Sequence, residues 1–126
     1  MLEQFKVSHD DAEFVQGDDL KKTVAGIFEK LGVSPEDSLL AADVQVLADL
    51  RGVDSHGVSN MLKSYISGYQ EGSINPRPNW KVVRETPSTA TVDSDKGLGT
   101  IITLGCKINK IYLSLSLRTK KIVSLK

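Results

Sequence analysis

Arg51-Gly-Val-Asp-Ser-His-Gly-Val-Ser-Asn60 separates two runs of sequence whose apolar residues recur at helical spacing. The two glycines of this decapeptide, with Asp54 and Ser55 as candidate N-caps, predict a turn that ends one helix and begins the next. We therefore expect His56 to lie on that turn, beside the first free amides of the second helix. An imidazole in such a place stays partly hydrated and can meet an anionic group.

Three amphipathic helices are predicted around this turn. The first is capped by Asp18 or Asp19 and stops at Gly32. The second starts at Ser34-Pro35-Glu36-Asp37, which offers a capping side chain, a first-turn proline and acids at the positive end of the helix dipole. It ends near Arg51, and the third helix runs from about 57 to 71. The apolar positions expected to face inward are Leu20, Val24, Ile27, Phe28 and Leu31, then Leu39, Leu40, Val44, Leu47 and Leu50, then Met61, Leu62, Tyr65, Ile66 and Tyr69.

A β-hairpin is predicted after the helices. Prolines keep residues 75–78 extended, and two β-type runs follow at 80–86 and 89–93 with a Pro-Ser turn between them. Trp80 is expected to pack under the hairpin, and Gly97-Leu-Gly99 then permits a sharp turn. The sequence therefore predicts an α+β fold, with an N-terminal region of three amphipathic helices followed by a β-hairpin.

Composition indicates an ordinary globular chain of one domain's length. Of its 126 residues, 40% are hydrophobic and 25% are charged, and the formal net charge is zero. A single cysteine, Cys106, cannot form an internal disulfide and suits a reducing compartment. The first residues lack the apolar stretch of a signal peptide, and no run is long enough to cross a bilayer. We therefore expect a cytoplasmic protein with no membrane partner.

The chain changes character after about Gly99. Residues 1–100 contain all sixteen acidic residues and ten basic ones, whereas residues 101–126 contain six basic residues and no acid. A basic tail can bind nucleic acid or anionic lipid, but residues 112–117 alternate like a strand and not like a basic amphipathic helix. We expect no nucleic-acid partner. The predicted regions are an arm at 1–17, a helical and hairpin region at 18–100, and an atypical basic tail at 101–126.

The decapeptide and three later features closely resemble the malate/L-lactate dehydrogenase family of nicotinamide-dependent 2-oxoacid reductases. The later features are Asn75-Pro-Arg-Pro78, the two β-type runs and Gly97-Leu-Gly99, and the resemblance covers about residues 15 to 100. It implies NAD or NADP as cofactor, a homodimeric parent protein and a cofactor-binding fold unrelated to the Rossmann type. Members continue with a cofactor-binding domain of roughly two hundred residues, which this chain lacks. We therefore expect a truncated or frame-shifted reading frame, out of phase after about Leu104.

The resemblance assigns the proton donor of the reaction to His56. Reduction of a 2-oxoacid needs a hydride donor, a proton donor at the carbonyl oxygen, and a cation or amide donors for the carboxylate. In the family, the histidine of the Ser-His-Gly motif lies in the substrate pocket and donates the proton, and imidazole exchanges protons near neutral pH. Ser55 would hydrogen-bond the substrate or the imidazole, or would instead cap the helix. Asp54 would orient His56 or remain solvated.

Asn60 marks a departure from the family. Many relatives have an arginine four residues after the histidine, where it would clamp the substrate carboxylate, and an asparagine has neither charge nor a bidentate fork. Lys63 would supply charge instead, or be solvated. Arg51 is the other nearby cation, and its alternative partner is the C-terminal end of the preceding helix. The candidate substrate-binding residues are thus Ser55, Asn60 and Arg51.

Other site chemistries find no support in the sequence. His9 and Cys106 are isolated, so no metal site is indicated. Gly97-Leu-Gly99 lacks the preceding parallel strand and the following acid of a dinucleotide loop, and no nucleophilic triad or phosphate loop is present. Two functions remain. One is an oxidoreductase acting on a small 2-oxoacid or 2-hydroxyacid with NAD or NADP, in which this chain alone is inactive; the other is a non-catalytic helical interaction or dimerisation module.

Overall fold

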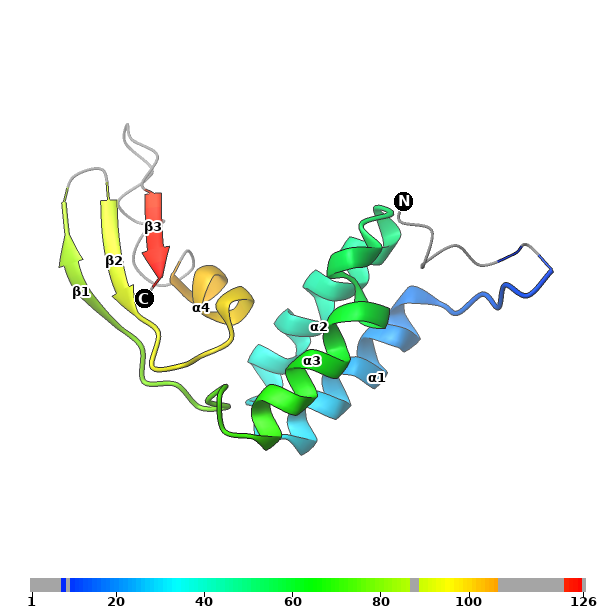
Figure 1. Cartoon of the computed structure of the whole chain (residues 1–126), viewed down its shortest axis with the longest axis horizontal. Coiled ribbons are helices and arrows are strands. Elements are labelled where there is room, and N and C mark those ends of the chain that lie inside the picture. Colours follow the sequence, from blue (N-terminus) through cyan, green and yellow to red (C-terminus); the bar gives the residue numbers. More distant parts are fainter. Residues whose placement is uncertain (1–7, 9, 87–88, 107–121, 126) are drawn as a thin grey trace. The chain divides into compact units, whose positions relative to one another are not determined.

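The computed structural model describes residues 8, 10–86, 89–106 and 122–125. Its fold is α+β, as the sequence predicts (Figure 1). The chain divides into two compact units, Met1–Gly72 and Ser73–Lys126. Helices and strands follow in the order α1 (Gly17–Lys30), α2 (Pro35–Leu50), α3 (Val58–Gln70), β1 (Lys81–Glu85), β2 (Thr89–Asp93), α4 (Gly99–Cys106) and β3 (Ile122–Leu125).

Helix α1 begins before the predicted aspartate caps. Gln16 occupies the N-cap position in an extended conformation, and its side chain makes no capping hydrogen bond. Asp18 and Asp19 lie within the first turn, near the positive end of the helix dipole. The predicted aspartate cap was therefore wrong, because a carboxylate stabilises the first turn as well as the cap position. The helix ends as predicted before Gly32, whose φ of 93° is left-handed.

Helix α2 begins at the predicted capping sequence. Ser34 is the N-cap; its Oγ accepts a hydrogen bond from the Asp37 backbone N–H at 3.2 Å and donates one to the Asp37 carboxylate at 2.8 Å. Pro35 occupies the first turn, where a backbone N–H would have no helical partner. The cap and the proline together fix the start of this helix.

The buried face of α2 differs from the predicted leucine face. Leu39, Leu47 and Leu50 are 47%, 41% and 73% exposed. Helix α1 packs along α2, and the small side chains on the inner face let the two helices approach closely. The prediction failed because α2 is apolar on more than one side, so periodicity alone does not select the inward face. The buried residues of α2 are Ser38, Ala41, Ala42, Gln45 and Val46.

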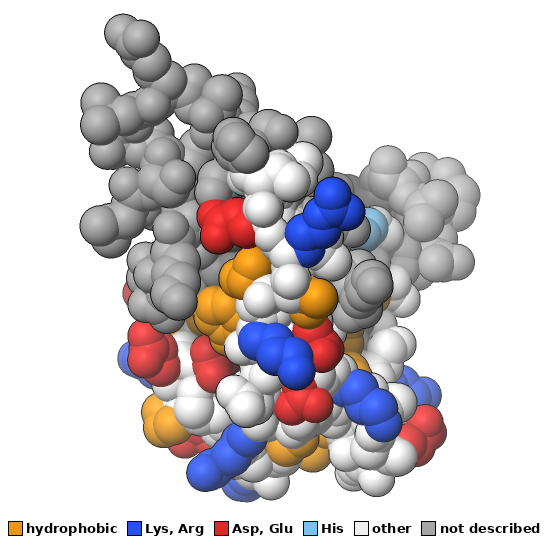
Figure 2. Space-filling model, turned by 90° about the vertical axis from the view of Figure 1, so that its left-hand side faces the viewer, with side chains coloured by type: hydrophobic (Ala, Val, Ile, Leu, Met, Phe, Trp, Pro, Cys, Tyr) orange, Lys and Arg blue, Asp and Glu red, His pale blue; other side chains and the backbone are white. Residues whose placement is uncertain are grey.

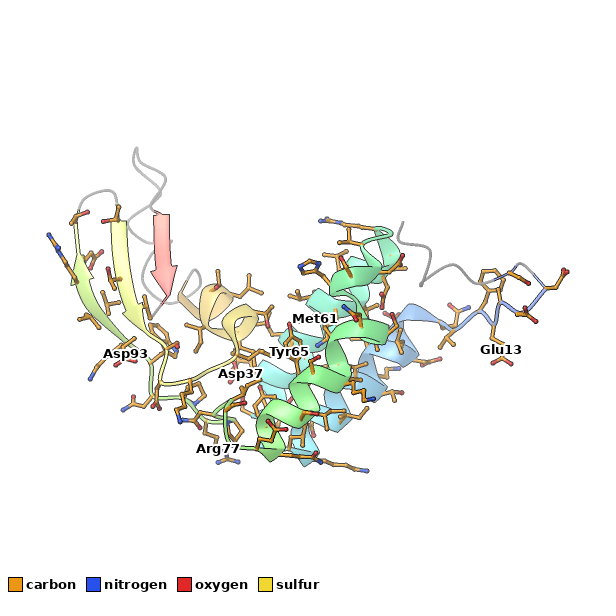
Figure 3. The ribbon with its side chains drawn as sticks, in the orientation of Figure 1. Glu13, Asp37, Met61, Tyr65, Arg77 and Asp93 are labelled. Atoms are coloured by element: carbon orange, nitrogen blue, oxygen red, sulfur yellow. The ribbon has the colours of Figure 1, made fainter. Side chains whose placement is uncertain are left out.

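Helix α3 matches its predicted span to within a residue at each end and is followed by Gly72, whose φ is 74°. Tyr69 is buried, and the other residues predicted to face inward are half-buried. Figure 3 shows two of them, Met61 and Tyr65, one turn apart on this helix. The fully buried ring of Phe28 contacts both tyrosines of α3. An aromatic cluster therefore joins α1 to α3.

The predicted hairpin forms in the second unit. Strands β1 and β2 pair antiparallel, with Val82 opposite Val92. The register shifts at Val83, and this bulged side chain is exposed. The predicted Pro87-Ser88 turn lies outside the described residues. Trp80 packs against the core of this unit as predicted, together with Val82, on a cluster made of Ala90, Val92 and Ile102.

Two elements of the second unit were not predicted. Helix α4 buries Ile101 and Ile102, which the sequence analysis assigns to the start of the tail. Strand β3 pairs parallel with β2, so the sheet order is β1-β2-β3; a strand of four residues is too short for periodicity to identify. The alternation at 112–117 lies outside the described residues. The division into 1–17, 18–100 and 101–126 stays a prediction.

The left-handed residues of the turn between β2 and α4 are not the predicted glycines. They are Asp95, with φ 49°, and Lys96, with φ 58°. The Gly97 N–H closes the turn on the Ser94 carbonyl at 2.8 Å. Gly97 is required for a steric reason, because a Cβ there would lie 2.7 Å from both the Pro78 and the Ile102 side chains. The predicted turn at 97–99 therefore lies within two residues of the observed one. The left-handed conformation falls on Asp95 and Lys96 and not on the glycines.

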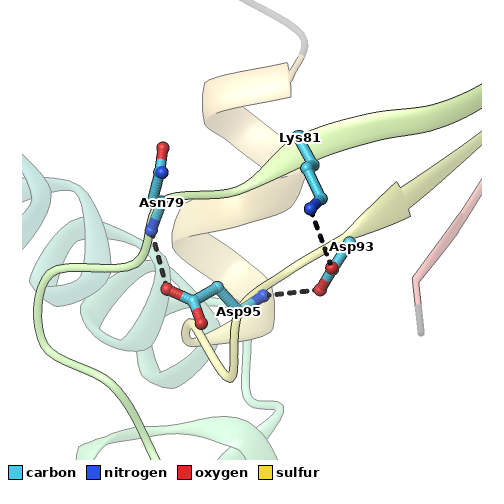
Figure 4. A network of polar contacts seen from close by, with 4 residues as sticks. All are labelled: Asn79, Lys81, Asp93 and Asp95. Carbon is cyan, nitrogen blue, oxygen red and sulfur yellow. Dashed lines mark hydrogen bonds and ion pairs between the residues drawn. The ribbon is translucent and has the colours of Figure 1, made fainter.

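A polar network ties this turn to the segment that leads into β1. The Asp95 carboxylate accepts hydrogen bonds from the Asn79 backbone N–H at 2.9 Å and from the Asn75 side chain at 3.0 Å. The Asp95 N–H donates to the Asp93 carboxylate at 3.1 Å, and Asp93 pairs with Lys81 across the strands (Figure 4). Asp95 therefore connects segments that are sixteen and twenty residues away in sequence.

Charges of both signs share the molecular surface. Figure 2 shows Lys and Arg side chains lying among Asp and Glu side chains on one face, with hydrophobic side chains between them. Exposed ion pairs, such as that between Lys22 and Asp19 on α1, contribute little to stability individually. Among the described residues, no helix is both long and apolar enough to cross a membrane.

Candidate functional site

The turn that carries the candidate histidine begins where α2 ends. The Arg51 N–H bonds to the Leu47 and Ala48 carbonyls, and the Val53 N–H returns to the Ala48 carbonyl at 2.9 Å. Gly52 lies between them with φ 69°, a left-handed conformation that favours glycine. These bonds satisfy the last carbonyls of α2 and reverse the chain. The decapeptide thus folds as the turn that its glycines predict.

His56 lies in a short 3₁₀ turn, η2 (Asp54–His56), directly before α3. Its N–H donates to the Val53 carbonyl at 2.9 Å, and the Gly57 N–H donates to the Asp54 carbonyl at 3.2 Å. The His56 side chain is exposed. A hydrogen-bonded turn therefore presents the imidazole to solvent, as the sequence predicts.

Ser55 contacts the imidazole directly. Its Oγ lies 2.9 Å from His56 Nδ1, a hydrogen-bonding distance, and the tautomer of the ring decides which atom donates. Of the roles weighed for Ser55, the contact with the imidazole is present, whereas its side chain does not cap α3. Because Nδ1 is engaged by Ser55, Nε2 is the ring nitrogen that remains to meet a substrate.

Asn60 supports this pair from the first turn of α3. Its Nδ2 donates to the Ser55 carbonyl at 2.8 Å. A side-chain amide has two N–H donors; one is engaged here, and the other has no partner among the described residues. Ser55, His56 and Asn60 therefore form a connected group built from both sides of the turn.

The other candidates lie outside this group. Arg51 is the C-cap residue of α2 and is exposed, and Lys63 is exposed on α3. Within the described part of the chain, no hydrogen bond or ion pair joins the side chain of Arg51, Asp54 or Lys63 to His56. Asp54 is half-buried and contributes its backbone carbonyl to the turn.

Sequence reasoning missed Asp49. Its carboxylate reaches from the last turn of α2 and accepts a hydrogen bond from the Val58 N–H at 2.9 Å. Two predictions about this point were wrong: the first amide of α3 is not free, and neither Asp54 nor Ser55 caps the helix, because Gly57 is the N-cap. The signal was available in the sequence, since an acid in the last turn of a helix faces the negative end of its own dipole.

The described residues show neither a metal-binding cluster nor an open glycine loop at Gly97. No group of three or more His, Cys, Asp or Glu side chains in this part of the chain is placed to hold a metal ion. At Gly97, Pro78 and Ile102 fill the space in which a dinucleotide loop would bring its backbone to a pyrophosphate. The group formed by Ser55, His56 and Asn60 is therefore the candidate catalytic and binding site in this part of the chain.

Residues 15–106 match the sequence model of malate/L-lactate dehydrogenase. The chain belongs to the malate/L-lactate dehydrogenase family. It is 46% identical over 88 residues to a malate dehydrogenase of Pyrococcus horikoshii, and 44% identical over 82 residues to an L-sulfolactate dehydrogenase of Methanocaldococcus jannaschii. These matches cover 70% and 65% of this chain, and 24% of each relative. The chain therefore spans about a quarter of the length of these relatives.

Solved structures share the fold of this family member. The malate dehydrogenase from Pyrococcus horikoshii OT3 superposes with a TM-score of 0.79 at 38% identity, over 93% of this chain and 33% of that one. The sulfolactate dehydrogenase from Methanocaldococcus jannaschii gives 0.67 at 40% identity, over 71% and 26%. Malate and sulfolactate are both 2-hydroxyacids, so these relatives are 2-hydroxyacid oxidoreductases by name.

Proposed function

We propose that this chain carries the proton-transfer site of an NAD(P)-dependent 2-hydroxyacid dehydrogenase. The observation that supports this proposal best is the Ser55–His56 contact of 2.9 Å on an exposed turn, in a chain whose family members interconvert 2-hydroxyacids and 2-oxoacids. The substrate is a small acid such as malate or lactate, with its 2-oxoacid. The reaction takes place in the cytoplasm.

His56 is the proton donor for the carbonyl oxygen of the 2-oxoacid. As the imidazolium, it donates Nδ1–H to Ser55 Oγ and presents Nε2–H to the substrate; after the transfer, the neutral ring keeps its Nδ1 proton. Ser55 thereby holds the ring in one orientation and one tautomer, which is the role that a hydrogen-bonded neighbour has beside many catalytic histidines. In the reverse direction, Nε2 takes the hydroxyl proton of the 2-hydroxyacid.

Asn60 and Arg51 are proposed to bind the substrate. The free N–H of the Asn60 amide supplies one neutral hydrogen bond to a carboxylate, and Arg51 supplies charge at the start of the turn. A single amide donor holds a carboxylate less tightly than a bidentate guanidinium does. Ser55 contributes through its contact with the imidazole.

The hydride in this reaction comes from NADH or NADPH, which is the chemistry that the cofactor supplies when bound. Side chains of Pro78 and Ile102 crowd Gly97, so the cofactor is not assigned to this glycine loop. We therefore attribute proton transfer and substrate orientation to this chain. The chain alone is expected not to turn over substrate.

The experiment that tests this proposal is a chimera. Residues 15–106 replace the matching segment of the Pyrococcus horikoshii malate dehydrogenase, which is 46% identical over 88 residues. The chimera should oxidise malate with NAD or NADP, and His56→Ala should lower kcat by roughly 10² to 10⁴, the cost of losing a positioned acid. The control is Ser64→Ala, an exposed α3 position outside the site. An unchanged kcat in His56→Ala would reject the proposal.

A second candidate function is supported by the exposed leucines of α2. A helical interaction or dimerisation module would use such an apolar surface, and the exposed residues lie on α2 instead of α3. If this chain dimerises through that surface, a change to Gln at Leu39, Leu47 or Leu50 should convert its dimer to a monomer. Light scattering over a concentration series measures this change. The enzymatic proposal also implies a homodimer in the longer relatives, so dimerisation of an inactive chimera is the result that favours the module over the enzyme.

A further inference from the structure

Asp49 occupies an unfavourable position for its own helix. It is the penultimate residue of α2, where the exposed carbonyls carry partial negative charge and disfavour a carboxylate. The residue is half-buried, so its charge is incompletely screened by water. Within the described part of the chain, no lysine, arginine or histidine pairs with it. The interaction that stabilises the Asp49 carboxylate must therefore come from another element.

That interaction is with the start of α3. Asp49 Oδ2 lies 2.9 Å from the Val58 nitrogen and accepts its N–H. Val58 is the first residue of α3, whose own N-cap, Gly57, has no side chain to perform this task. The carboxylate thus lies at the positive end of α3 and satisfies an amide that has no partner inside the helix. One helix supplies the cap of the next.

Gly57 is matched to this arrangement. Its φ of −82° and ψ of −176° are accessible to any L-residue, so backbone conformation does not demand a glycine here. The close contact with Asp49 favours a glycine, because a Cβ at Gly57 would overlap the Asp49 carboxylate. The glycine of the Ser-His-Gly sequence therefore leaves the space into which Asp49 reaches.

We infer that Asp49 is a positioning residue for His56. The hydrogen bond from Val58 to Asp49 closes the segment 49–58 into a loop that contains the histidine. It fixes the first turn of α3, from which Asn60 holds the Ser55 carbonyl at 2.8 Å, and Ser55 in turn contacts His56. Asp49 therefore acts on the imidazole through the backbone, without touching it. Its importance for catalysis rests on the function proposed for His56.

A double-mutant cycle in the full chain tests the Asp49–Gly57 contact. Gly57→Ala should lower the thermal midpoint by about 5 °C or more, a typical response of a small domain to a lost interaction. In an Asp49→Ala background the same change should lower it by less than about half as much, because the obstructing carboxylate is gone. The control is Gly26→Ala on α1, where a Cβ meets nothing within 4 Å and the midpoint should not fall. Equal losses in both backgrounds would overturn the inference.

The effect on the imidazole is read by ¹⁵N NMR of the full chain. The chain has two histidines, so a His9→Gln variant assigns the His56 signals. In Asp49→Ala, the His56 Nδ1 signal should move toward that of a free imidazole, and the Val58 amide should exchange at least about tenfold faster. Asp49→Asn keeps an acceptor oxygen and should remain closer to wild type in both signals. Asp43→Ala, an exposed position on the same helix, should change neither.

The outcomes separate this inference from the proposed function. Unchanged His56 and Val58 signals in Asp49→Ala overturn the positioning role. If Asp49→Ala does not fold, Gly57→Ala decides instead, because its Cβ displaces the Asp49 carboxylate: shifted Val58 and His56 signals support the role, and unshifted signals overturn it. If the signals move but His56→Ala leaves the chimera fully active, the proposed function fails while the positioning of the turn by Asp49 stands.

Discussion

The ring of Tyr69 meets the ring of Phe28 edge-on, with the centroids 6.1 Å apart and the planes at 78°. This is a favoured geometry for two aromatic side chains, and it joins the end of α3 to the core of α1. The Tyr69 hydroxyl is buried and has no hydrogen-bond partner in the described structure. Burial, and to a smaller extent the nearby Asp37 carboxylate and Tyr65, together raise the pKa of Tyr69 to about 12.

Tyr69→Phe should therefore preserve or increase stability. The change keeps the edge-on ring contact and removes a buried hydroxyl whose desolvation costs about 1–3 kcal/mol when it lacks a partner. Urea unfolding followed by circular dichroism measures the difference. Tyr65→Phe is the control, since Tyr65 is only half-buried and its ring also contacts Phe28. A loss of more than about 1 kcal/mol in Tyr69→Phe would mean that the hydroxyl makes a stabilising bond.

Alkaline pH should weaken the helical unit through the same residue. A tyrosine in the unfolded chain ionises near pH 10, whereas the pKa of Tyr69 in the folded chain is about 12. The stability that depends on a protonated Tyr69 is therefore fully present below pH 10 and is lost as the pH rises through 12. Thermal midpoints measured from pH 8 to 12 should fall more steeply for the wild type than for Tyr69→Phe. Parallel curves for the two proteins would contradict this assignment.

Local signals explain why much of the fold could be predicted. Ser34 and Pro35 mark a helix start through their own chemistry, and Gly32, Gly52 and Gly72 each adopt the left-handed φ at which their helices end. The hairpin was recognisable because β-type runs on both sides of a turn need no distant partner. His56 was placed on its turn for the same reason. Each of these features depends on residues that are close together in sequence.

Features that depend on tertiary contact were missed. The inward face of α2 is set by how closely α1 approaches, and a helix that is apolar on several sides does not reveal this choice. Asp49 caps α3 across nine residues of sequence, and only the fold shows that its carboxylate reaches Val58. Strand β3 obtains its pairing from β2, more than thirty residues earlier, so its own short sequence carries too little information.

Asn60→Arg should tighten substrate binding in the chimera. An arginine adds charge and a bidentate fork for a carboxylate, and hydrogen bonds to charged groups are worth about 1.5–3 kcal/mol. We therefore expect KM for the 2-oxoacid to fall roughly tenfold or more. The kcat should fall by a smaller factor, because the proton donor is retained while the Asn60 bond to the Ser55 carbonyl is lost. Steady-state kinetics with oxaloacetate and pyruvate measure both constants.

The control for this prediction is Ser64→Arg, which adds the same charge one turn further along an exposed face of α3. It should leave KM nearly unchanged, because a single exposed charge outside the site is screened by salt. If Ser64→Arg lowers KM as much as Asn60→Arg does, the effect is a general attraction of the anion. Position 60 would then not be a carboxylate contact.

Adjacent residues in the turn after β2 should respond to glycine with opposite signs. Asp95 and Lys96 both have a positive φ, which costs an L-residue roughly 1–2 kcal/mol. Lys96 is exposed, and the bond that its backbone carbonyl accepts from the Asn75 N–H at 2.9 Å survives substitution. Lys96→Gly should therefore stabilise the chain by about 0.5–1 kcal/mol, since it creates the Asp-Gly pair that such left-handed turns prefer.

Asp95→Gly relieves the same backbone strain but removes the carboxylate that accepts from the Asn75 side chain and the Asn79 N–H. Two lost hydrogen bonds to a charged acceptor outweigh the relief, so a net loss of about 1–3 kcal/mol is expected. Aspartate also tolerates the left-handed region better than lysine does, which makes the relief smaller at this position. Urea unfolding of the two variants, monitored by the fluorescence of Trp80 in the same unit, measures both changes. If Asp95→Gly stabilised the chain, the hydrogen bonds of the Asp95 carboxylate would contribute less free energy than the positive φ of Asp95 costs.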